Sequence, residues 1–220
     1  MKLINLDYKI KWKTASVFIG LLVILLALTG YYVGYRYWFA QVNYYDYKTA
    51  SLKKILDRQP DSGSTRAELA MTSYLKGDVQ ESIEMMREVL KTEPQNDKAA
   101  LYLGLILGEQ KNYRESIDLL TSYVKNHQDF TTRIAYEGLG KSLMGTGQYE
   151  SALKYLELAA SRDPGNASIY YNLGRTYEQL NKPKNAMLSY ERALQISGSY
   201  PEAETALINL ENKMLGKGNN

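Results

Sequence analysis

The sequence contains no cysteine among its 220 residues and only one histidine, His127. Without cysteine the chain forms no disulfide, offers no thiolate to a metal and has no cysteine nucleophile. One histidine also argues against a histidine-based metal site or catalytic triad, because both need several partner residues. These absences disfavour most classes of enzyme, so we expect no catalytic residue, no metal site and no cofactor.

The chain also has little net charge, which is +3. Residues 1–61 hold nine Lys/Arg and four Asp, and the remainder holds 18 basic and 20 acidic residues. The basic excess therefore belongs to the N-terminal part, whereas nucleic-acid-binding domains carry concentrated basic patches. We expect no nucleic-acid partner. Hydrophobic residues at 45% and charged residues at 23% indicate a folded chain rather than a disordered one.

One segment lacks charge altogether: from Thr14 to Tyr35 the sequence reads TASVFIGLLVILLALTGYYVGY. Crossing the hydrocarbon core of a bilayer takes about 20 apolar residues in a helix. We therefore predict a transmembrane helix over residues 14–36, preceded by an N-terminal tail over residues 1–13. Amphipathic aromatic rings prefer the membrane interface. The flanking rings predicted to lie there are Trp12, Tyr31, Tyr32, Tyr35, Tyr37 and Trp38.

The flanking cations predict the orientation of this helix. Four lysines lie in the thirteen residues before the uncharged stretch, whereas Arg36 and Lys48 are the only cations in the fifteen residues after it. The positive-inside rule then places the N-terminus in the cytoplasm and the long C-terminal part outside. We expect a single-pass protein of a bacterial cytoplasmic membrane. One alternative is a cleaved signal peptide, for which Ala27-Leu28-Thr29 is a poor cleavage site, and another is a buried core helix.

A repeat governs the remaining sequence. Pro60 and Pro94 each close a helical pattern and lie 34 residues apart, and Pro164 follows 70 residues later. A fixed period of this length is typical of repeat architectures, and here it leaves a two-residue insertion at Thr131 and Thr132. Each unit contains two amphipathic helical segments separated by a turn. The predicted units are residues 63–96, 97–130, 133–166 and 167–200.

Fixed positions within each unit carry fixed residue types. The seventh residue is always leucine, and the eighth is small: Ala70, Gly104, Gly140 or Gly174. Antiparallel helices approach to roughly 8–10 Å only where the crossing side chains are small. In the turns, Gly77 and Gly147 suit the positive φ that often ends a helix.

This pattern resembles the tetratricopeptide repeat, most clearly in ASIYYNLGRTYEQLNKPKNAMLSYERALQIS of the last unit. The resemblance implies an all-α fold: a right-handed superhelical stack of about four helical hairpins. Residues 37–61 are expected to form a membrane-proximal helix or half-repeat. Residues 201–216 are expected to form a capping helix, because an open end would expose the shared core. Residues 217–220 are expected to be a disordered tail.

In this family the first helices line a concave face, commonly through the second, fifth, ninth and twelfth positions of each unit. Apolar Met and Tyr side chains there suit a segment of a partner protein, because they bury area and repack. The alternative is that several of them only pack against neighbouring helices. Carrying the positions over, with adjacent residues, predicts a partner-binding groove of Met71, Tyr74, Lys98, Leu101, Tyr102, Leu105, Lys141, Met144, Tyr171, Asn172 and Arg175.

The resemblance implies a membrane-anchored scaffold or assembly factor. Its expected partners are the lipid bilayer, through one span, and a membrane-associated or exported protein bound on the extracytoplasmic side. Two alternatives stay open. One is a permanent accessory subunit that docks through the span and the segment Tyr31–Tyr47. The other is a module for cell-wall or exported polysaccharide, and self-association is also left open.

Overall fold

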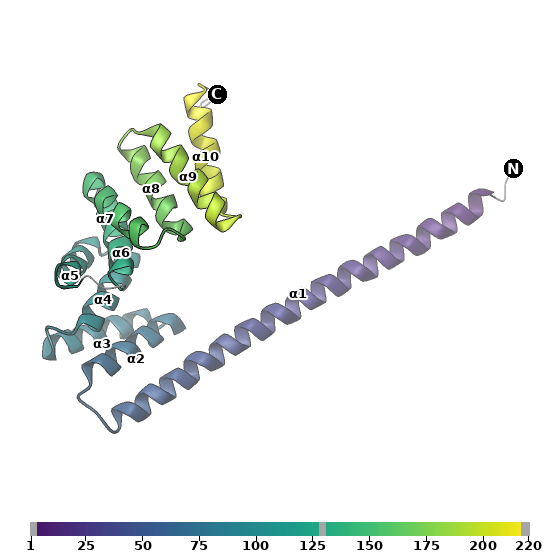
Figure 1. Cartoon of the computed structure of the whole chain (residues 1–220). Helices are drawn as coiled ribbons and strands as arrows, with labels where there is room; N and C mark the ends of the chain where they lie inside the picture. Colours follow the sequence, from purple (N-terminus) through teal and green to yellow (C-terminus); the bar gives the residue numbers. More distant parts are fainter. Residues whose placement is uncertain (1–3, 128–130, 217–220) are drawn as a thin grey trace. The chain divides into compact units, whose positions relative to one another are not determined.

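The computed structural model describes residues 4–127 and 131–216, with side chains except those of residues 4–21 and 37–43. The described chain folds into ten α-helices without a strand (Figure 1). It divides into two compact units, Met1–Lys54 and Ile55–Asn220, which are considered separately. The predicted tail over residues 217–220 lies outside the described residues.

Helix α1 (Ile4–Leu56) forms the N-terminal unit, and no proline interrupts it. From Leu22 to Leu28 its large apolar side chains are 56–62% exposed. Tyr31, Tyr32 and Tyr35 are also at least half exposed. The other predicted interface residues Trp12, Tyr37 and Trp38, and residues 14–21 of the predicted span, fall outside the described side chains.

Among the residues that the structure describes, no helix combines the length and the apolar character that crossing a membrane requires.

Four helical hairpins and a final helix form the C-terminal unit (Figure 1). In each hairpin a first helix is followed by a second of similar length. The first helices are α2 (Gly63–Lys76), α4 (Asp97–Glu109), α6 (Thr132–Gly145) and α8 (Ala167–Gln179). The second helices are α3 (Val79–Thr92), α5 (Tyr113–Asn126), α7 (Tyr149–Arg162) and α9 (Pro183–Ser197), and α10 (Pro201–Met214) follows.

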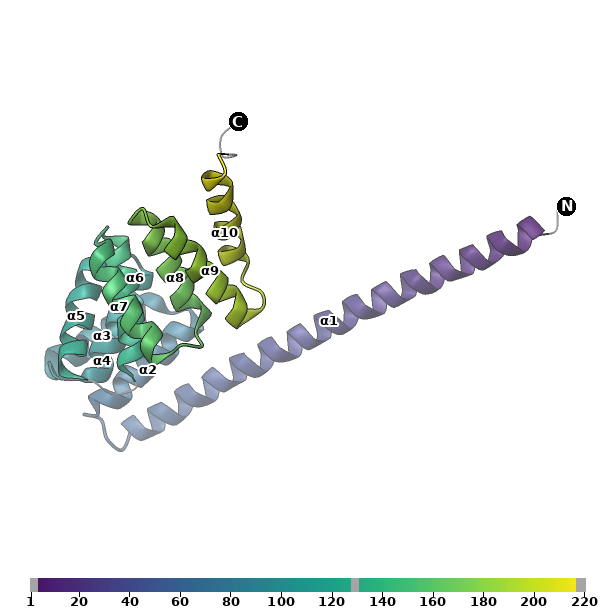
Figure 2. The ribbon, with the colours of Figure 1, turned by 45° about the horizontal axis from the view of Figure 1, so that its top comes forward.

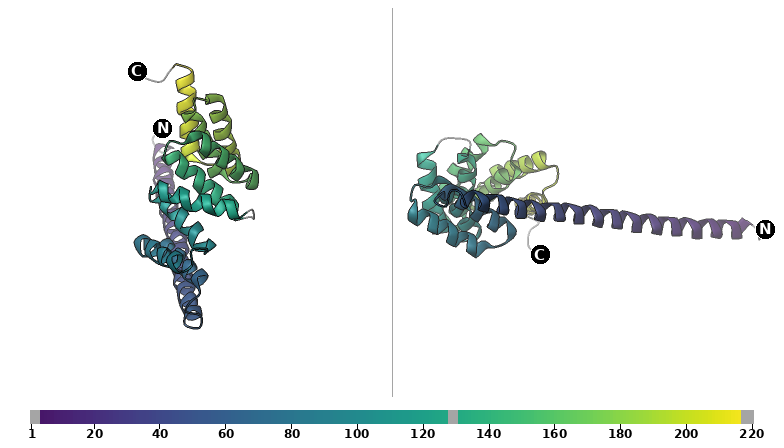
Figure 3. Two further views of the ribbon diagram at one scale, coloured as in Figure 1. Left: turned by 90° about the vertical axis from the view of Figure 1, so that its left-hand side faces the viewer. Right: turned by 90° about the horizontal axis from the view of Figure 1, so that it is seen from below.

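The packing of these helices is the same from one hairpin to the next. Each first helix packs against the second helix of its own hairpin, and the second helix then packs against the following first helix. Successive first helices also contact one another, from α2 through α4 and α6 to α8. Figures 2 and 3 show the hairpins following one another in chain order, with α10 beside α9. The first helices thus form one continuous layer.

Side-chain caps mark the starts of three first helices, and residues with positive φ mark the turns inside the hairpins. The side chains of Ser62, Asn96 and Asn166 accept hydrogen bonds from the first backbone N–H groups of α2, α4 and α8. The turn inside each hairpin contains one residue with positive φ. These residues are Gly77 (103°), Lys111 (63°), Gly147 (76°) and Asn181 (55°). The expectation for Gly77 and Gly147 is confirmed. Lys111 is the costliest of the four, because it has neither the freedom of glycine nor the short polar side chain that lets asparagine adopt positive φ.

Small residues on the first helices make the close hairpin contact. A Cβ added to Gly104 or Gly140 would lie 2.8 or 2.7 Å from the Leu120 or Leu156 side chain. A Cβ on Gly174 would overlap the ring of Tyr190. The first hairpin instead pairs Ala70 with Met86, a flexible side chain that adapts to the extra methyl group. In each unit, therefore, the side chain of the twenty-fourth residue packs against the small eighth residue.

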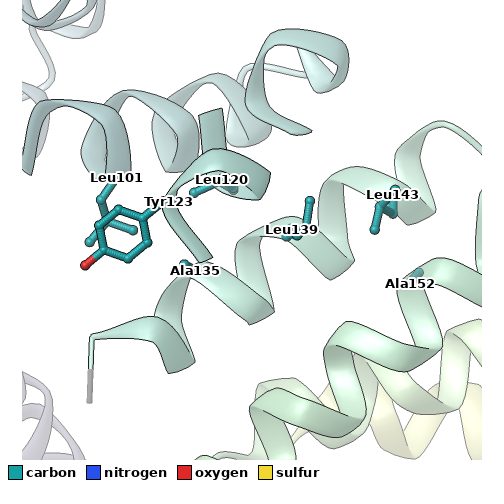
Figure 4. Close-up of a cluster of buried hydrophobic side chains, with 7 residues drawn as sticks. All are labelled: Leu101, Leu120, Tyr123, Ala135, Leu139, Leu143 and Ala152. Atoms are coloured by element: carbon teal, nitrogen blue, oxygen red, sulfur yellow. The ribbon is translucent and has the colours of Figure 1, made fainter. Parts of the chain in front are cut away.

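The two-residue insertion contacts the core between the second and third hairpins, which Figure 4 shows. Tyr123 is buried there at a position that holds valine or alanine in the other units, and its ring stacks on His127 at 4.3 Å. The hydroxyl of Tyr123 lies 2.5 Å from that of Thr131, in the insertion. The other residues of this cluster are Leu101, Leu120, Ala135, Leu139, Leu143 and Ala152.

The last helix covers the fourth hairpin through buried Ala203 and Leu210. If Pro201 is counted as the first residue of a further unit, the eighth residue is Ile208, which is 50% exposed. In the four preceding first helices, this place is held by alanine or glycine.

The Gly174–Tyr190 contact predicts an interaction between two substitutions. Gly174→Ala should destabilise the fold by about 1–3 kcal/mol, because the new methyl group overlaps a rigid buried ring. In a Tyr190→Met background the same change should be harmless or stabilising. The first hairpin already accommodates Ala70 beside Met86, and alanine favours a helix over glycine by about 1 kcal/mol. Urea unfolding of the four proteins measures the coupling. Equal destabilisation in both backgrounds would contradict the contact.

Tyr190 also predicts a response to alkaline pH. Burial, and then the hydrogen bond that its hydroxyl donates to Glu178, raise the pKa of Tyr190 far above its ordinary value. The unfolded chain loses this proton near pH 10, whereas the folded chain retains it. The contribution of Tyr190 to the free energy of unfolding should therefore be constant below about pH 10 and should decrease as the pH rises further. Urea unfolding at about pH 8 and 11 should show a larger loss for the wild type than for Tyr190→Phe; equal losses would refute this.

Candidate functional site

Two hollows open along the layer of first helices. The first, about 350 Å³, lies between α2, α4 and α6 and is called the apolar hollow. Its apolar lining consists of Met71, Tyr74, Leu105, Ile106 and Ile134. The second, about 340 Å³, lies between α4, α6 and α8 and is called the cationic hollow. Both are lined by Gly108, Glu109 and Lys141, so together they form one groove.

Glycine allows the helices beneath the groove to approach closely. A Cβ on Gly138 of α6 would lie 2.5 Å from Leu105 Cδ2 of α4. A Cβ on Gly108 of α4 would lie 2.8 Å from Ser142 Oγ of α6. Neither glycine is needed for positive φ, so their role is the close approach of backbones.

Polar contacts between hairpins hold the groove in register. The Lys141 ammonium lies 2.5 Å from Glu109 Oε1 on the preceding first helix. Glu137 accepts hydrogen bonds from Ser168 Oγ at 2.8 Å and Asn166 Nδ2 at 3.3 Å, at the start of α8. In the apolar hollow, Lys141 and Glu109 are thus bound to each other. The other charged group, Glu137, is bound to the next hairpin.

The cationic hollow contains two cations besides Lys141. Arg175 lies over the ring of Tyr171 at 5.8 Å, a cation–π contact. Lys111 reaches the same hollow from the turn between α4 and α5. Within the described residues, neither side chain forms an ion pair. Half-buried Tyr113 and Tyr149 also line this hollow.

Seven of the eleven predicted groove residues line the two hollows, and whether they bind a partner stays a prediction. Asn172 is among them, although it is only 5% exposed and its amide Nδ2 donates to the Ser168 carbonyl oxygen. The seven are Met71, Tyr74, Leu105, Lys141, Met144, Asn172 and Arg175.

The other four predicted residues lie elsewhere. Leu101 is 6% exposed and belongs to the core of Figure 4, and Tyr102 packs against neighbouring core clusters. Tyr171 packs between the rings of Tyr190 and Tyr200. Lys98 forms an ion pair with Glu68 at 2.6 Å and lines a separate shallow hollow beside Pro94. Tyr102 and Tyr171 are therefore both engaged with other side chains.

Sequence reasoning also missed several lining residues. Lys111, Tyr113 and Tyr149 come from a turn and from the first residues of second helices, so positions carried over for first helices alone could not include them. Glu109 could have been found from its charge, since it lies 32 residues before Lys141 and the pair Glu68–Lys98 has a similar spacing.

The groove offers apolar surface, hydrogen-bonding groups and cations, which are the groups that hold a peptide segment. Over the residues that the structure describes, no three His, Asp or Glu side chains gather closely enough to bind a metal ion.

Comparison with known proteins points to one family. The family model described as the tetratricopeptide repeat matches residues 50–129 and 138–207, about two thirds of the chain. No curated protein matches the chain.

Solved structures share the fold. A crystal structure of MamA is 26% identical and covers 66% of this chain and 83% of its own, with a TM-score of 0.59. MamA from Desulfovibrio magneticus RS-1 is 20% identical, covers 70% and 85% respectively, and also scores 0.59. YrrB, described as a repeat protein of this type with an unusual peptide-binding site, is 21% identical, covers 76% and 85%, and scores 0.62.

Proposed function

Because this chain belongs to the tetratricopeptide repeat family, we propose that it is a non-catalytic scaffold that binds a segment of a partner protein in the groove over α2, α4, α6 and α8. The observation that carries the proposal is the continuity of the two hollows across four neighbouring first helices. The similar fold of YrrB, a protein with a peptide-binding site, supports the same class of ligand.

We further propose that α1 anchors the protein in a bacterial cytoplasmic membrane, with the N-terminus in the cytoplasm and the repeats on the other side. The support is the uncharged stretch from Thr14 to Tyr35 and the excess of lysine before it. The exposed apolar side chains from Leu22 to Leu28 have no partner surface within their own unit other than the helix itself. A tether raises the local concentration of the groove near membrane-associated partners and strengthens weak contacts.

Exposed tyrosines on α1 favour a second candidate, the accessory subunit of a membrane complex. Tyr31 and Tyr47 are 76% and 75% exposed, and aromatic residues are enriched in protein interfaces. In that case α1, rather than the groove, would make the main contacts. The two candidates differ in whether changes to the groove abolish binding.

Ile134 provides the test of the groove, because it is 42% exposed and lines the apolar hollow. Ile134→Glu should abolish the selection of peptides from a phage-displayed random library by the full-length protein in detergent, because a charge then occupies the apolar hollow. Leu188→Glu is the matched control, since Leu188 is 66% exposed on α9 and lines neither hollow. Melting curves should show both variants folded. Peptides retained by Ile134→Glu, or none selected by the wild type, would reject binding in the groove.

Alkaline carbonate extraction tests the anchor. The wild-type chain should stay with the membrane pellet, whereas Ile24→Lys with Leu26→Lys should release it, because each lysine at the centre of a span costs roughly 2.5–3.5 kcal/mol. Tyr44→Lys with Tyr47→Lys, outside the uncharged stretch, should stay in the pellet. Release of the wild type by carbonate would exclude the anchor and leave the groove proposal intact.

A further inference from the structure

We propose that the cationic hollow is a carboxylate-binding subsite that seats an Asp or Glu side chain of the bound segment. The inference rests on the proposed function and adds to it the chemistry of the partner. The segment it describes is extended, with an apolar side chain in the apolar hollow and an acidic side chain in the cationic one.

The charges of the two hollows differ in sign. Lys111, Lys141 and Arg175 line the cationic hollow against one carboxylate, Glu109. The apolar hollow has Lys141 against Glu109 and Glu137. Since Lys141 and Glu109 pair with each other, the charges left over are two cations in one hollow and one carboxylate in the other. Complementarity places an acidic ligand group beside Lys111 and Arg175.

The backbone at Lys111 gives a second, independent reason. The corresponding turn residues in the other three hairpins are Gly77, Gly147 and Asn181, which adopt positive φ most readily. A lysine in this conformation is less stable than a glycine, because its Cβ approaches the backbone. The one turn that departs from the preferred residue types is the turn whose side chain reaches the cationic hollow. Local strain of this kind concentrates at functional positions.

The surroundings of Arg175 prepare it to bind a carboxylate. Its stacking on Tyr171 restricts the guanidinium, which loses less freedom on binding a ligand. Gln179 lines the same hollow and adds a side-chain amide that can donate a hydrogen bond. A guanidinium and an ammonium that converge on one carboxylate make charge-assisted hydrogen bonds, the stronger kind.

The spacing of the two hollows sets the spacing of the ligand groups. The hollows are offset by one first helix, and neighbouring helices lie about 8–10 Å apart. An extended chain rises about 3.3 Å per residue. The acidic side chain should therefore lie about three residues from the apolar one.

The test compares Lys111→Gly with Asn181→Gly in the full-length protein. Both changes place glycine at a positive-φ turn, and neither should lower the urea midpoint; Lys111→Gly should raise it. Only Lys111 lines the cationic hollow. Each protein is panned against random peptides fused at their C-terminus to a phage coat protein, so that any acidic preference reports side chains rather than a free terminal carboxylate.

The wild type and Asn181→Gly should select peptides with Asp or Glu about three residues from an apolar residue. Lys111→Gly and Arg175→Gln should lose the acidic enrichment by about tenfold and keep the apolar preference, since a hydrogen bond to a charged group corresponds to roughly that factor. Replacing the selected Glu by Gln in a synthetic peptide should weaken wild-type binding by about tenfold.

Three outcomes would overturn the subsite. Selection of apolar peptides without acidic enrichment would leave the scaffold function standing and remove the subsite. Acidic enrichment that survives in both Lys111→Gly and Arg175→Gln would assign the carboxylate to another surface. Failure of the wild type to select any peptide would remove both proposals.

Discussion

The stack depends on one steric constraint, the close contact of two helices at a residue without a bulky side chain. Gly104, Gly140 and Gly174 each receive a leucine or tyrosine from their own second helix, and the fully buried partners leave no room for a Cβ. The contact sets the distance within a hairpin, and that distance determines which faces remain for the neighbouring hairpins. A hairpin cannot bury its apolar side alone, so its stability is shared with its neighbours.

The groove follows from how successive hairpins are joined. First helices contact first helices through Gly108 and Gly138, and ion pairs such as Lys141–Glu109 lie across the joint. Exposed ion pairs contribute little free energy, typically below 1 kcal/mol, so their effect is mainly on register. Packing supplies the stability, and the polar contacts align the two hollows.

The period of 34 residues and the small eighth position were sufficient to predict the hairpins, because both arise from local helix geometry. The groove was harder to predict. Leu101 occupies a position that the family pattern assigns to the groove, and Tyr102 is next to it, but both side chains pack against core clusters. Lys111, Tyr113 and Tyr149 enter it from turns and helix starts, whose direction depends on tertiary packing. The insertion was visible in the spacing, but its bond to Tyr123 was not.

The last helix limits how the array can be enlarged. Ile208 stands where the other first helices have alanine or glycine, and its branched side chain would obstruct a second helix placed in the usual way. An additional hairpin grafted onto this helix would therefore meet a steric block rather than a template. Protein engineers who wish to lengthen the solenoid would first have to make room at that single place.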